Sequence, residues 1–249
     1  MTPVICGGPR PPFPLSASGG VFAGNTLRRD MVEPKGKGGN AFRRTGLLLV
    51  VSAPSGAGKT TLCREMAHTM PGLQYSISYT TRSPRANEVD GKDYFFIPEA
   101  EFMRMVERNE FAEWARVHNN LYGTHAGFLK RTMAGGTDVL LDVDIQGAKL
   151  LKKRFPDGIF IFVLPPSMAI LMERLRERRS DTPEEIERRL QVAREEIRNF
   201  SDYDYIIIND EIKKAIRDLE SVILAERIRI AHTDQAWIRE QFLKEKGET

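Results

Sequence analysis

The chain has 249 residues, enough for one large domain or for one domain with short extensions. Hydrophobic residues make up 41% and charged residues 29%, the balance of an ordinary soluble protein with a packed core. A formal net charge of +3 is too small to indicate nucleic-acid binding, so no nucleic-acid partner is expected. No stretch reaches the roughly 18–20 consecutive apolar residues of a membrane span. The two cysteines, Cys6 and Cys63, match no metal-ligand or disulfide pattern, which favours a cytoplasmic location.

Residues 1–45 differ in composition from the rest of the chain. They contain the run Gly7–Pro14 and the run Lys35–Gly39, whose glycines and prolines sustain neither helix nor strand. We predict a disordered or low-complexity extension. Two alternatives remain open. The first 29 residues carry arginines but no Asp or Glu, as in an organelle transit peptide, or else translation starts at Met31.

From Leu47 onward, short apolar runs alternate with helical patterns. The runs predict strands buried on both faces, at Leu47–Val51, Val139–Leu141, Ile159–Val163 and Tyr205–Ile208. Helices are expected at about 59–68, 147–154, 168–178, 183–199 and 211–231. This alternation predicts an α/β fold with a doubly wound parallel sheet.

Residues 75–125 interrupt that alternation. They are rich in Tyr, Thr, Phe and Gly and predict an inserted β-rich subdomain with one helix near 99–108. We therefore expect a core of residues 46–75 and 126–230, an insertion over about 76–125, and a C-terminal helix or tail over 231–249.

A phosphate-binding loop follows the first predicted strand. Residues 53–60 match G-x-x-x-x-G-K-[ST], with Ala53 in place of the first Gly, between a strand and a helix. The glycines let backbone N–H groups converge on phosphate, Lys59 would reach the β- and γ-phosphates, and the Thr60 hydroxyl would bind Mg²⁺. Ala53 fits if its φ is negative; an ordinary glycine turn is the alternative. The predicted ATP-binding residues are Ala53, Pro54, Ser55, Gly56, Ala57, Gly58, Lys59, Thr60 and Thr61.

A second anion site is predicted in the insertion. Arg82 and Arg85 lie three residues apart among hydroxyl side chains, and Tyr94 follows. Two planar guanidinium groups and a phenol suit a phosphate dianion. By composition alone, the alternative is a solvated loop with incidental basic residues.

The stretch Ser78–Tyr94 resembles the GMP-binding signature of guanylate kinases, and the similarity extends from about Leu47 to about Leu224. The resemblance implies a P-loop nucleoside monophosphate kinase that transfers the γ-phosphoryl group of Mg·ATP to GMP or dGMP. This reaction recycles GMP and supplies GTP and dGTP in purine nucleotide metabolism. The residues that would hold GMP are Ser78, Arg82, Arg85, Tyr94, Glu113, Tyr122 and Thr124.

By this resemblance, Glu113 faces the guanine. Guanine presents two adjacent donors, N1–H and the 2-amino group, which one carboxylate accepts together. Adenine has an acceptor at N1 and no 2-amino group, so the carboxylate would stay unpaired and discrimination on the order of 10⁴ is expected. An exposed carboxylate at a helix end is the alternative for Glu113.

The predicted strand at 139–141 is followed by two carboxylates, Asp142 and Asp144, in a Walker-B-like run. Strand alternation places both on one face at the carboxyl end of the sheet, where α/β proteins bind ligands. One would support Mg²⁺ and the other would contact substrate, and the pattern does not separate them. As a working assignment, Asp144 takes the metal and Asp142 the substrate. The alternative is a strand-end or helix-capping role.

A helical lid is predicted over about 174–195. Residues 180–183 stop one helix and restart the next, with Thr182 as N-cap and Pro183 as first helical residue. By resemblance, Arg178 and Arg189 are the catalytic arginines of the lid, together with Lys59 and Arg85 elsewhere; such an arginine is worth about 10³–10⁵ in rate. The alternative is that these lid arginines form ion pairs with glutamates on the surface of a charged helix. Resemblance also places Asn209 near the ATP adenine.

Two rival functions share parts of this pattern. A scaffold that keeps the fold without catalysis tends to lose the P-loop lysine or the lid arginines, and this chain has both. A P-loop kinase for another small phosphate, such as a phosphorylated sugar, need not keep Arg82, Arg85, Tyr94 and Glu113 together. The sequence leaves open whether the protein is a monomer or a homo-oligomer.

Overall fold

The structure is a computed structural model that describes residues 44–117, 119–177 and 182–243. All of these fall within one unit of the chain, residues 40–249. Nearly all of the predicted extension over 1–45 lies outside the described residues, as does Cys6, so that prediction stays open.

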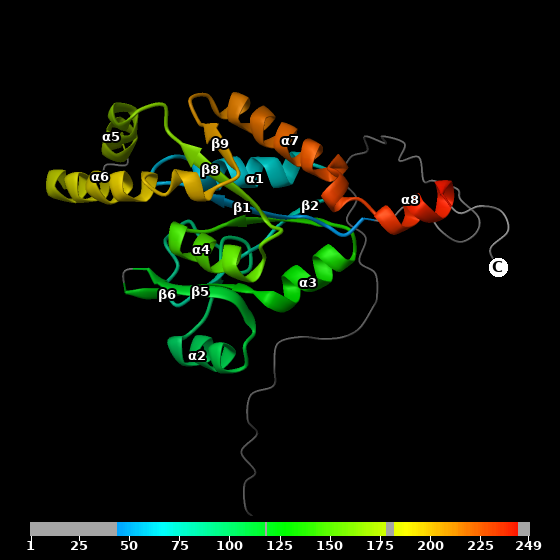
Figure 1. Ribbon diagram of the computed structural model, residues 1–249. Helices are drawn as coiled ribbons and strands as arrows, with labels where there is room; N and C mark the ends of the chain where they lie inside the picture. The colour runs from blue at the N-terminus through cyan, green and yellow to red at the C-terminus, as the bar shows by residue number, and fades with distance from the viewer. Residues whose placement is uncertain (1–43, 118, 178–181, 244–249) are drawn as a thin grey trace, which may run out of the picture. The chain divides into compact units, whose positions relative to one another are not determined.

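The described core contains a parallel sheet, which confirms the predicted α/β class (Figure 1). Its neighbours pair in parallel throughout, in the order β2 (Leu73–Tyr75), β7 (Asp138–Asp142), β1 (Leu48–Ser52), β8 (Ile159–Leu164) and β9 (Tyr205–Ile208). All of β1 is buried, as expected of a central strand covered on both faces. The short strand β2 was not predicted, because three residues carry too little pattern.

Helices cover both faces of this sheet (Figure 1). On one face, α1 (Lys59–Thr69) and α7 (Ile212–Ile228) pack against Leu49 and Val51. On the other face, α3 (Ala126–Ala134) and α4 (Ile145–Arg154) pack against Leu48 and Val50. The alternation of β1 side chains thus separates the two halves of the core. Helix α3 was not predicted; it is only nine residues long and has a glycine in its first turn.

The insertion forms a second, mixed sheet beside α3 and α4 (Figure 1). Its strand order is β4 (Phe95–Phe96), β3 (Tyr79–Thr80), β6 (Asn120–His125) and β5 (Phe111–Val117). Helix α2 (Glu99–Glu107) covers it through Phe102, which is fully buried and stacks on Phe111 with ring centroids 4.4 Å apart. Arg154 of α4 donates to the carbonyls of Phe111 and Ala112, at 2.7 and 3.0 Å, and so joins the two sheets.

The remaining helices follow the core strands. Helix α5 (Met168–Glu177) packs on α6 (Pro183–Ile197) through Leu171, Leu175, Leu190 and Ala193. As predicted, the Thr182 hydroxyl caps α6 by accepting from the Glu185 N–H at 3.3 Å, with Pro183 first in the helix. After α7 come the short helices η2 (Ile230–His232) and α8 (Gln235–Phe242); η1 (Phe200–Asp202) precedes β9. None of the helices described here is long and apolar enough to cross a bilayer.

A buried carboxylate joins both ends of the core. Asp138, at the start of β7, is fully buried. Its carboxylate accepts from Arg44 at 2.5 and 3.0 Å, from Arg227 Nε at 2.7 Å and from the Leu47 N–H at 2.8 Å. Burial acts to raise the pKa of Asp138, but the two arginines and the N–H outweigh it, so the pKa is lower than usual.

Replacing Asp138 by Asn should therefore destabilise the fold, because two arginines lose their shared counter-charge. We expect the free energy of unfolding in urea at pH 7 to fall by about 3 kcal/mol. Folding lowers the pKa of Asp138. The difference in unfolding free energy between wild type and Asp138→Asn should therefore be complete above about pH 4 and shrink as pH falls further.

The control is Arg198→Gln, which breaks the Arg198–Glu195 pair, whose side chains are 75% and 52% exposed. It should change stability by less than about 0.5 kcal/mol. Equal stability of the Asp138→Asn and Arg198→Gln variants at pH 7 would contradict the structural role of Asp138.

Candidate active site

The phosphate-binding loop connects the carboxyl end of β1 to the first turn of α1. Gly56 and Gly58 have φ angles of 98° and 87°, in the left-handed region that glycine tolerates. Among the described residues, Asn109 is the one non-glycine with positive φ, so Ala53 meets the condition set from the sequence. The loop therefore has the backbone that directs N–H groups and a helix N-terminus at an anion.

Asn209 supports the loop from behind. Its Nδ2 donates to the Ala57 carbonyl at 2.7 Å, and a Cβ on Gly58 would lie 2.4 Å from that nitrogen. Arg174 in turn donates to the Asn209 carbonyl at 2.9 Å. Asn209 is buried. The structure thus shows a supporting role for Asn209, and the predicted adenine contact stays a prediction.

Lys59 and Thr60 both contact Asp142. Lys59 Nζ pairs with the Asp142 carboxylate and donates to the Val143 carbonyl at 2.6 Å, while the Thr60 hydroxyl donates to Asp142 Oδ2 at 2.6 Å. Burial acts to lower the pKa of Lys59, but Asp142 outweighs it and the pKa is raised, which keeps the amine charged. A hydroxyl and a carboxylate oxygen at one point are hard donors that suit Mg²⁺.

The contacts of Asp144 differ from those of Asp142. Its Oδ1 accepts from the Gly147 N–H at 2.7 Å and caps helix α4, as in the capping alternative considered from the sequence. Thr60 and Lys59 contact Asp142 rather than Asp144. These contacts favour Asp142 as the residue that supports Mg²⁺, which is the reverse of the working assignment. No cluster of three His, Cys, Asp or Glu side chains that would hold a metal occurs among the described residues.

Of the residues predicted to hold the GMP phosphate, Arg82, Tyr94 and Tyr122 lie close together in the insertion. The Arg82 guanidinium lies 5.5 Å from the centre of the Tyr94 ring, and the rings of Tyr94 and Tyr122 are 5.9 Å apart. Glu88, which sequence reasoning missed, accepts from Arg82 and from the Arg85 N–H, at 2.8 and 2.7 Å. The Arg85 side chain is exposed. Glu88 thereby orders the segment that carries both arginines.

Glu113 is a buried carboxylate in the middle of β5, not an exposed helix-end residue. The hydroxyl of Thr124, on the paired strand β6, donates to Glu113 Oε1 at 2.6 Å. Burial raises the pKa of Glu113 to about 7, partly offset by the Thr124 hydrogen bond. Ser78, just before β3, is half-buried, and its carbonyl accepts from the Phe95 N–H at 2.9 Å.

Gly147 is a further site residue that the sequence reasoning missed. A Cβ on Gly147 would lie 3.1 Å from Glu113 Oε2 and 3.3 Å from Asp144 Oδ1. The missing side chain therefore lets the first turn of α4 approach the buried carboxylate closely. A glycine at the start of a predicted helix was the available signal.

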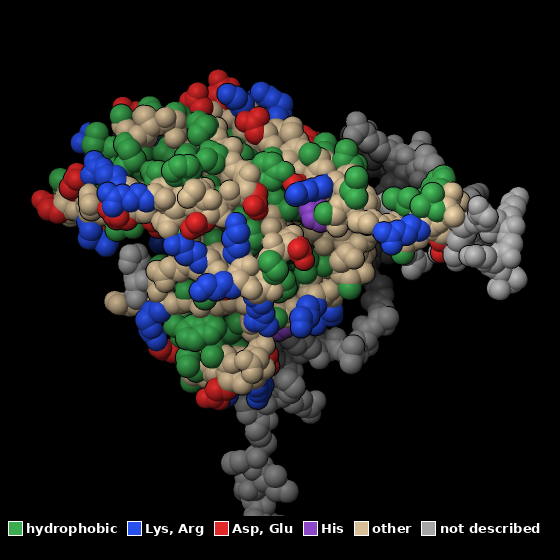
Figure 2. Space-filling model, in the orientation of Figure 1, with side chains coloured by type: hydrophobic (Ala, Val, Ile, Leu, Met, Phe, Trp, Pro, Cys, Tyr) green, Lys and Arg blue, Asp and Glu red, His purple; other side chains and the backbone are tan. Residues whose placement is uncertain are grey.

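Helix α6, which belongs to the predicted lid, contacts the phosphate loop. Arg189 donates to the Ser55 hydroxyl at 2.7 Å. Arg188 pairs with Glu185 at 2.5 Å on the exposed side of α6, where Figure 2 shows acidic and basic side chains interspersed. Arg178 lies outside the described residues, so its lid role stays a prediction.

Among the described residues, two buried polar atoms have no partner within good hydrogen-bond geometry: Glu196 Oε2 of α6 and the Tyr203 hydroxyl. Burial raises the pKa of the Glu196 carboxylate, partly offset by the nearby Ser55 N–H. Tyr203 stacks on Phe162 with ring centroids 4.6 Å apart. No local pattern distinguishes Glu196 from the other charged residues of α6.

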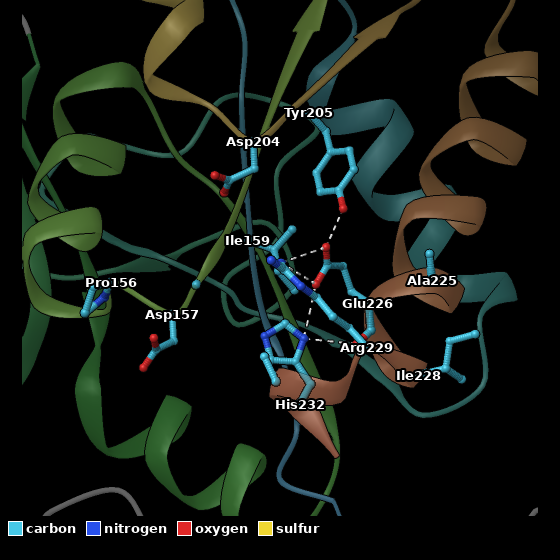
Figure 3. A pocket seen from close by; sticks show the side chains of 12 residues that line it. Pro156, Asp157, Ile159, Asp204, Tyr205, Ala225, Glu226, Ile228, Arg229 and His232 are labelled. Atoms are coloured by element: carbon cyan, nitrogen blue, oxygen red, sulfur yellow. Dashed lines mark hydrogen bonds and ion pairs between the residues drawn. The ribbon is translucent and has the colours of Figure 1, made fainter.

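The cavities at the opposite edge of the sheet contain none of these residues. One of about 760 Å³ lies at the amino ends of β8 and β9, and another of about 620 Å³ lies beside it. In the first, Tyr205, Arg229 and His232 point at the buried Glu226 (Figure 3). The Glu226 carboxylate is thus satisfied within the protein.

A glycine-rich loop between a strand and a helix of a parallel sheet, an arginine of α6 against that loop and an inserted second sheet define a P-loop nucleoside monophosphate kinase. A profile described as guanylate kinase matches residues 45–226. The chain belongs to the guanylate kinase family.

Individual relatives agree with this assignment. A guanylate kinase of Geobacter sulfurreducens is 53% identical over 190 residues, covering 76% of this chain and 94% of the relative. One from Caldanaerobacter subterraneus is 44% identical, covering 80% and 97%. The crystal structure of guanylate kinase from Anaplasma phagocytophilum has a TM-score of 0.70 at 29% identity, covering 82% of this chain and 98% of that one.

Gly58→Ala should damage the phosphate loop. The new methyl would overlap the Asn209 amide and force alanine into left-handed backbone, so we expect ATP binding, measured by calorimetry, to weaken at least about 10-fold. Gly135→Ala is the matched control, because its Cβ would meet neighbours no closer than 3.4 Å. Equal ATP affinity of the two variants would show that the close packing at Gly58 is not needed.

Proposed function

We propose that this chain is a guanylate kinase that converts ATP and GMP into ADP and GDP. The observation that carries the choice of acceptor is the buried Glu113–Thr124 pair, in the same insertion as Arg82, Tyr94 and Tyr122. A carboxylate held there accepts from both N1–H and the 2-amino group of guanine. Membership of the family supports the same reaction.

On the donor side, the backbone of residues 53–60 binds the ATP phosphates and Lys59 contacts the β- and γ-phosphates. Bound Mg²⁺ neutralises charge on the phosphate oxygens, and Thr60 and Asp142 are the residues whose contacts fit it. Asp144 instead holds the first turn of α4. Thr61 and Asn209 complete the predicted nucleotide-binding set.

On the acceptor side, Arg82, Arg85, Tyr94 and Tyr122 hold the GMP phosphate. Two arginines and two phenols offer donors to the three oxygens of a phosphate dianion. Glu113 and Thr124 read the guanine, with Ser78 at the edge of the base. Because Gly147 has no side chain, helix α4 leaves space beside the Glu113 carboxylate.

Transfer needs no activated nucleophile, because the GMP phosphate oxygen is already anionic. That oxygen forms a bond to the γ-phosphorus while the bond from this phosphorus to the β,γ-bridging oxygen breaks, and ADP leaves with that electron pair. Lys59, Arg189 and Arg178 offset the charge that spreads over the transferred group. Closing of the lid over residues 174–195 and of the insertion over 76–125 would exclude water.

We place this activity in the cytoplasm, where it recycles GMP and supplies GTP and dGTP. The division into core, insertion and lid, and the C-terminal segment over 231–249, remain part of this proposal.

The test is ADP release from Mg·ATP by the full chain, with GMP, dGMP, AMP, CMP, UMP or a sugar phosphate as acceptor. We expect GMP and dGMP to be preferred. Glu113→Ala should lower kcat/KM for GMP by at least about 100-fold, because the guanine donors lose their acceptor.

Glu107→Ala, which removes an exposed carboxylate of α2, is the control and should leave GMP turnover unchanged. GMP binding without turnover would support a scaffold instead of an enzyme. Preference for another phosphate would keep the fold assignment and reject GMP as acceptor.

The pKa of Glu113 predicts a pH dependence of GMP use. With a pKa of about 7, about one tenth of Glu113 is ionised at pH 6 and nearly all of it at pH 8. Because the carboxylate is the form that accepts from guanine, KM for GMP should be about tenfold higher at pH 6 than at pH 8.

GMP itself gains a phosphate charge near pH 6, which acts in the same direction. Glu113→Gln therefore supplies the baseline, since it retains only the contribution of the phosphate. Identical pH profiles of wild type and Glu113→Gln would contradict ionisation of Glu113 in this range.

A further inference from the structure

Helix α1 carries a charged residue that neither the phosphate loop nor the hydrophobic core uses. Arg64 follows Thr60 by four residues, so the two side chains lie on the same face of the helix. The residues of α1 that enter the core are Leu62, Cys63 and Met66. Arg64 points elsewhere, and its side chain is 42% exposed.

Arg64 reaches from the core to the inserted sheet. Its Nη2 lies 2.6 Å from Asp93 Oδ1, in the segment that precedes β4. Arg64 is also within hydrogen-bonding reach of the Tyr75 side chain on β2. One guanidinium thus joins the helix that begins at the phosphate loop to the segment that carries Tyr94.

Asp93 also makes two hydrogen bonds to the backbone of Val89. Asp93 Oδ2 accepts from the Val89 N–H at 2.7 Å, and the Asp93 N–H donates to the Val89 carbonyl at 2.9 Å. Its side chain is only 12% exposed. The hydrogen bond from Val89 and the pairing with Arg64 lower the pKa of Asp93, which therefore stays ionised at neutral pH.

Tyr94 follows Asp93 directly. The Tyr94 carbonyl accepts from the Gly91 N–H at 2.8 Å, and the ring of Tyr94 lies against Arg82 and Tyr122. Pinning Asp93 therefore limits where the Tyr94 ring can lie. It also sets the distance between this acceptor site and the loop that binds ATP.

A partly exposed ion pair contributes little to stability, so stability alone does not account for this bridge. The geometry of the site accounts for the bridge, because transfer between two bound phosphates is sensitive to displacements of about 1 Å. We propose that Arg64 is a positioning residue, which through Asp93 and Tyr94 fixes the GMP phosphate relative to the phosphate loop. This inference rests on the proposed guanylate kinase reaction.

The test uses Arg64→Gln, Asp93→Asn, the double variant and Arg64→Lys in the full chain. We expect Arg64→Gln and Asp93→Asn each to lower kcat/KM for GMP by about 10- to 30-fold, with KM for ATP within about twofold of wild type. The double variant should be no worse than the more affected single variant, because both remove one interaction. Arg64→Lys should restore part of the activity, since its amine can still pair with Asp93.

The matched control is Arg116→Gln, which breaks the 2.9 Å pair between Arg116 and Glu99 within the inserted sheet and its helix. It should leave kcat/KM for GMP unchanged, and thermal unfolding should confirm that every variant is folded.

An unchanged kcat/KM in Arg64→Gln would overturn the proposal. So would an equal rise in KM for ATP and GMP, which would indicate general damage to α1, or losses that multiply in the double variant. If the wild-type chain turns over no GMP at all, the proposed function fails first and this inference falls with it.

Discussion

The partly buried pairing of Lys59 with Asp142 is the interaction on which the rest of the site depends. A lysine amine placed under a phosphate loop must stay charged when no nucleotide is present, and Asp142 supplies the compensating charge. Parallel pairing makes this possible, because Val51 of β1 lies opposite Asp142 of β7. The loop that follows β1 and the carboxylate that ends β7 therefore meet at one edge of the sheet.

The second sheet is arranged around the same edge. Glu113 on β5 faces the first turn of α4 across Gly147, and that helix is capped by Asp144, two residues beyond Asp142. Arg64 on α1 makes a second connection at Asp93. Donor and acceptor sites are thus each tied to elements that start at the carboxyl ends of β1 and β7.

The features that were predictable from the sequence are those encoded by neighbouring residues. The phosphate loop and the buried strands have short-range patterns, and the lid helix has a recognisable Thr-Pro start. Asp142 and Asp144 were not separable, because strand alternation gives them the same face and only contacts with Thr60 or Gly147 distinguish them. Glu196, Arg64 and Glu88 were missed because no periodicity in the sequence relates them to the residues that they lie against.

The buried carboxylate of Asp138 has a consequence for where this domain ends. The family profile spans residues 45–226, whereas the two arginines that neutralise Asp138 are Arg44 and Arg227, each one position outside that range. A chain trimmed to the profile would keep every residue proposed for binding and catalysis but leave a charge inside the protein without a counter-ion. The folding unit is therefore slightly larger than the unit of sequence similarity, and its two ends are brought together by a single side chain.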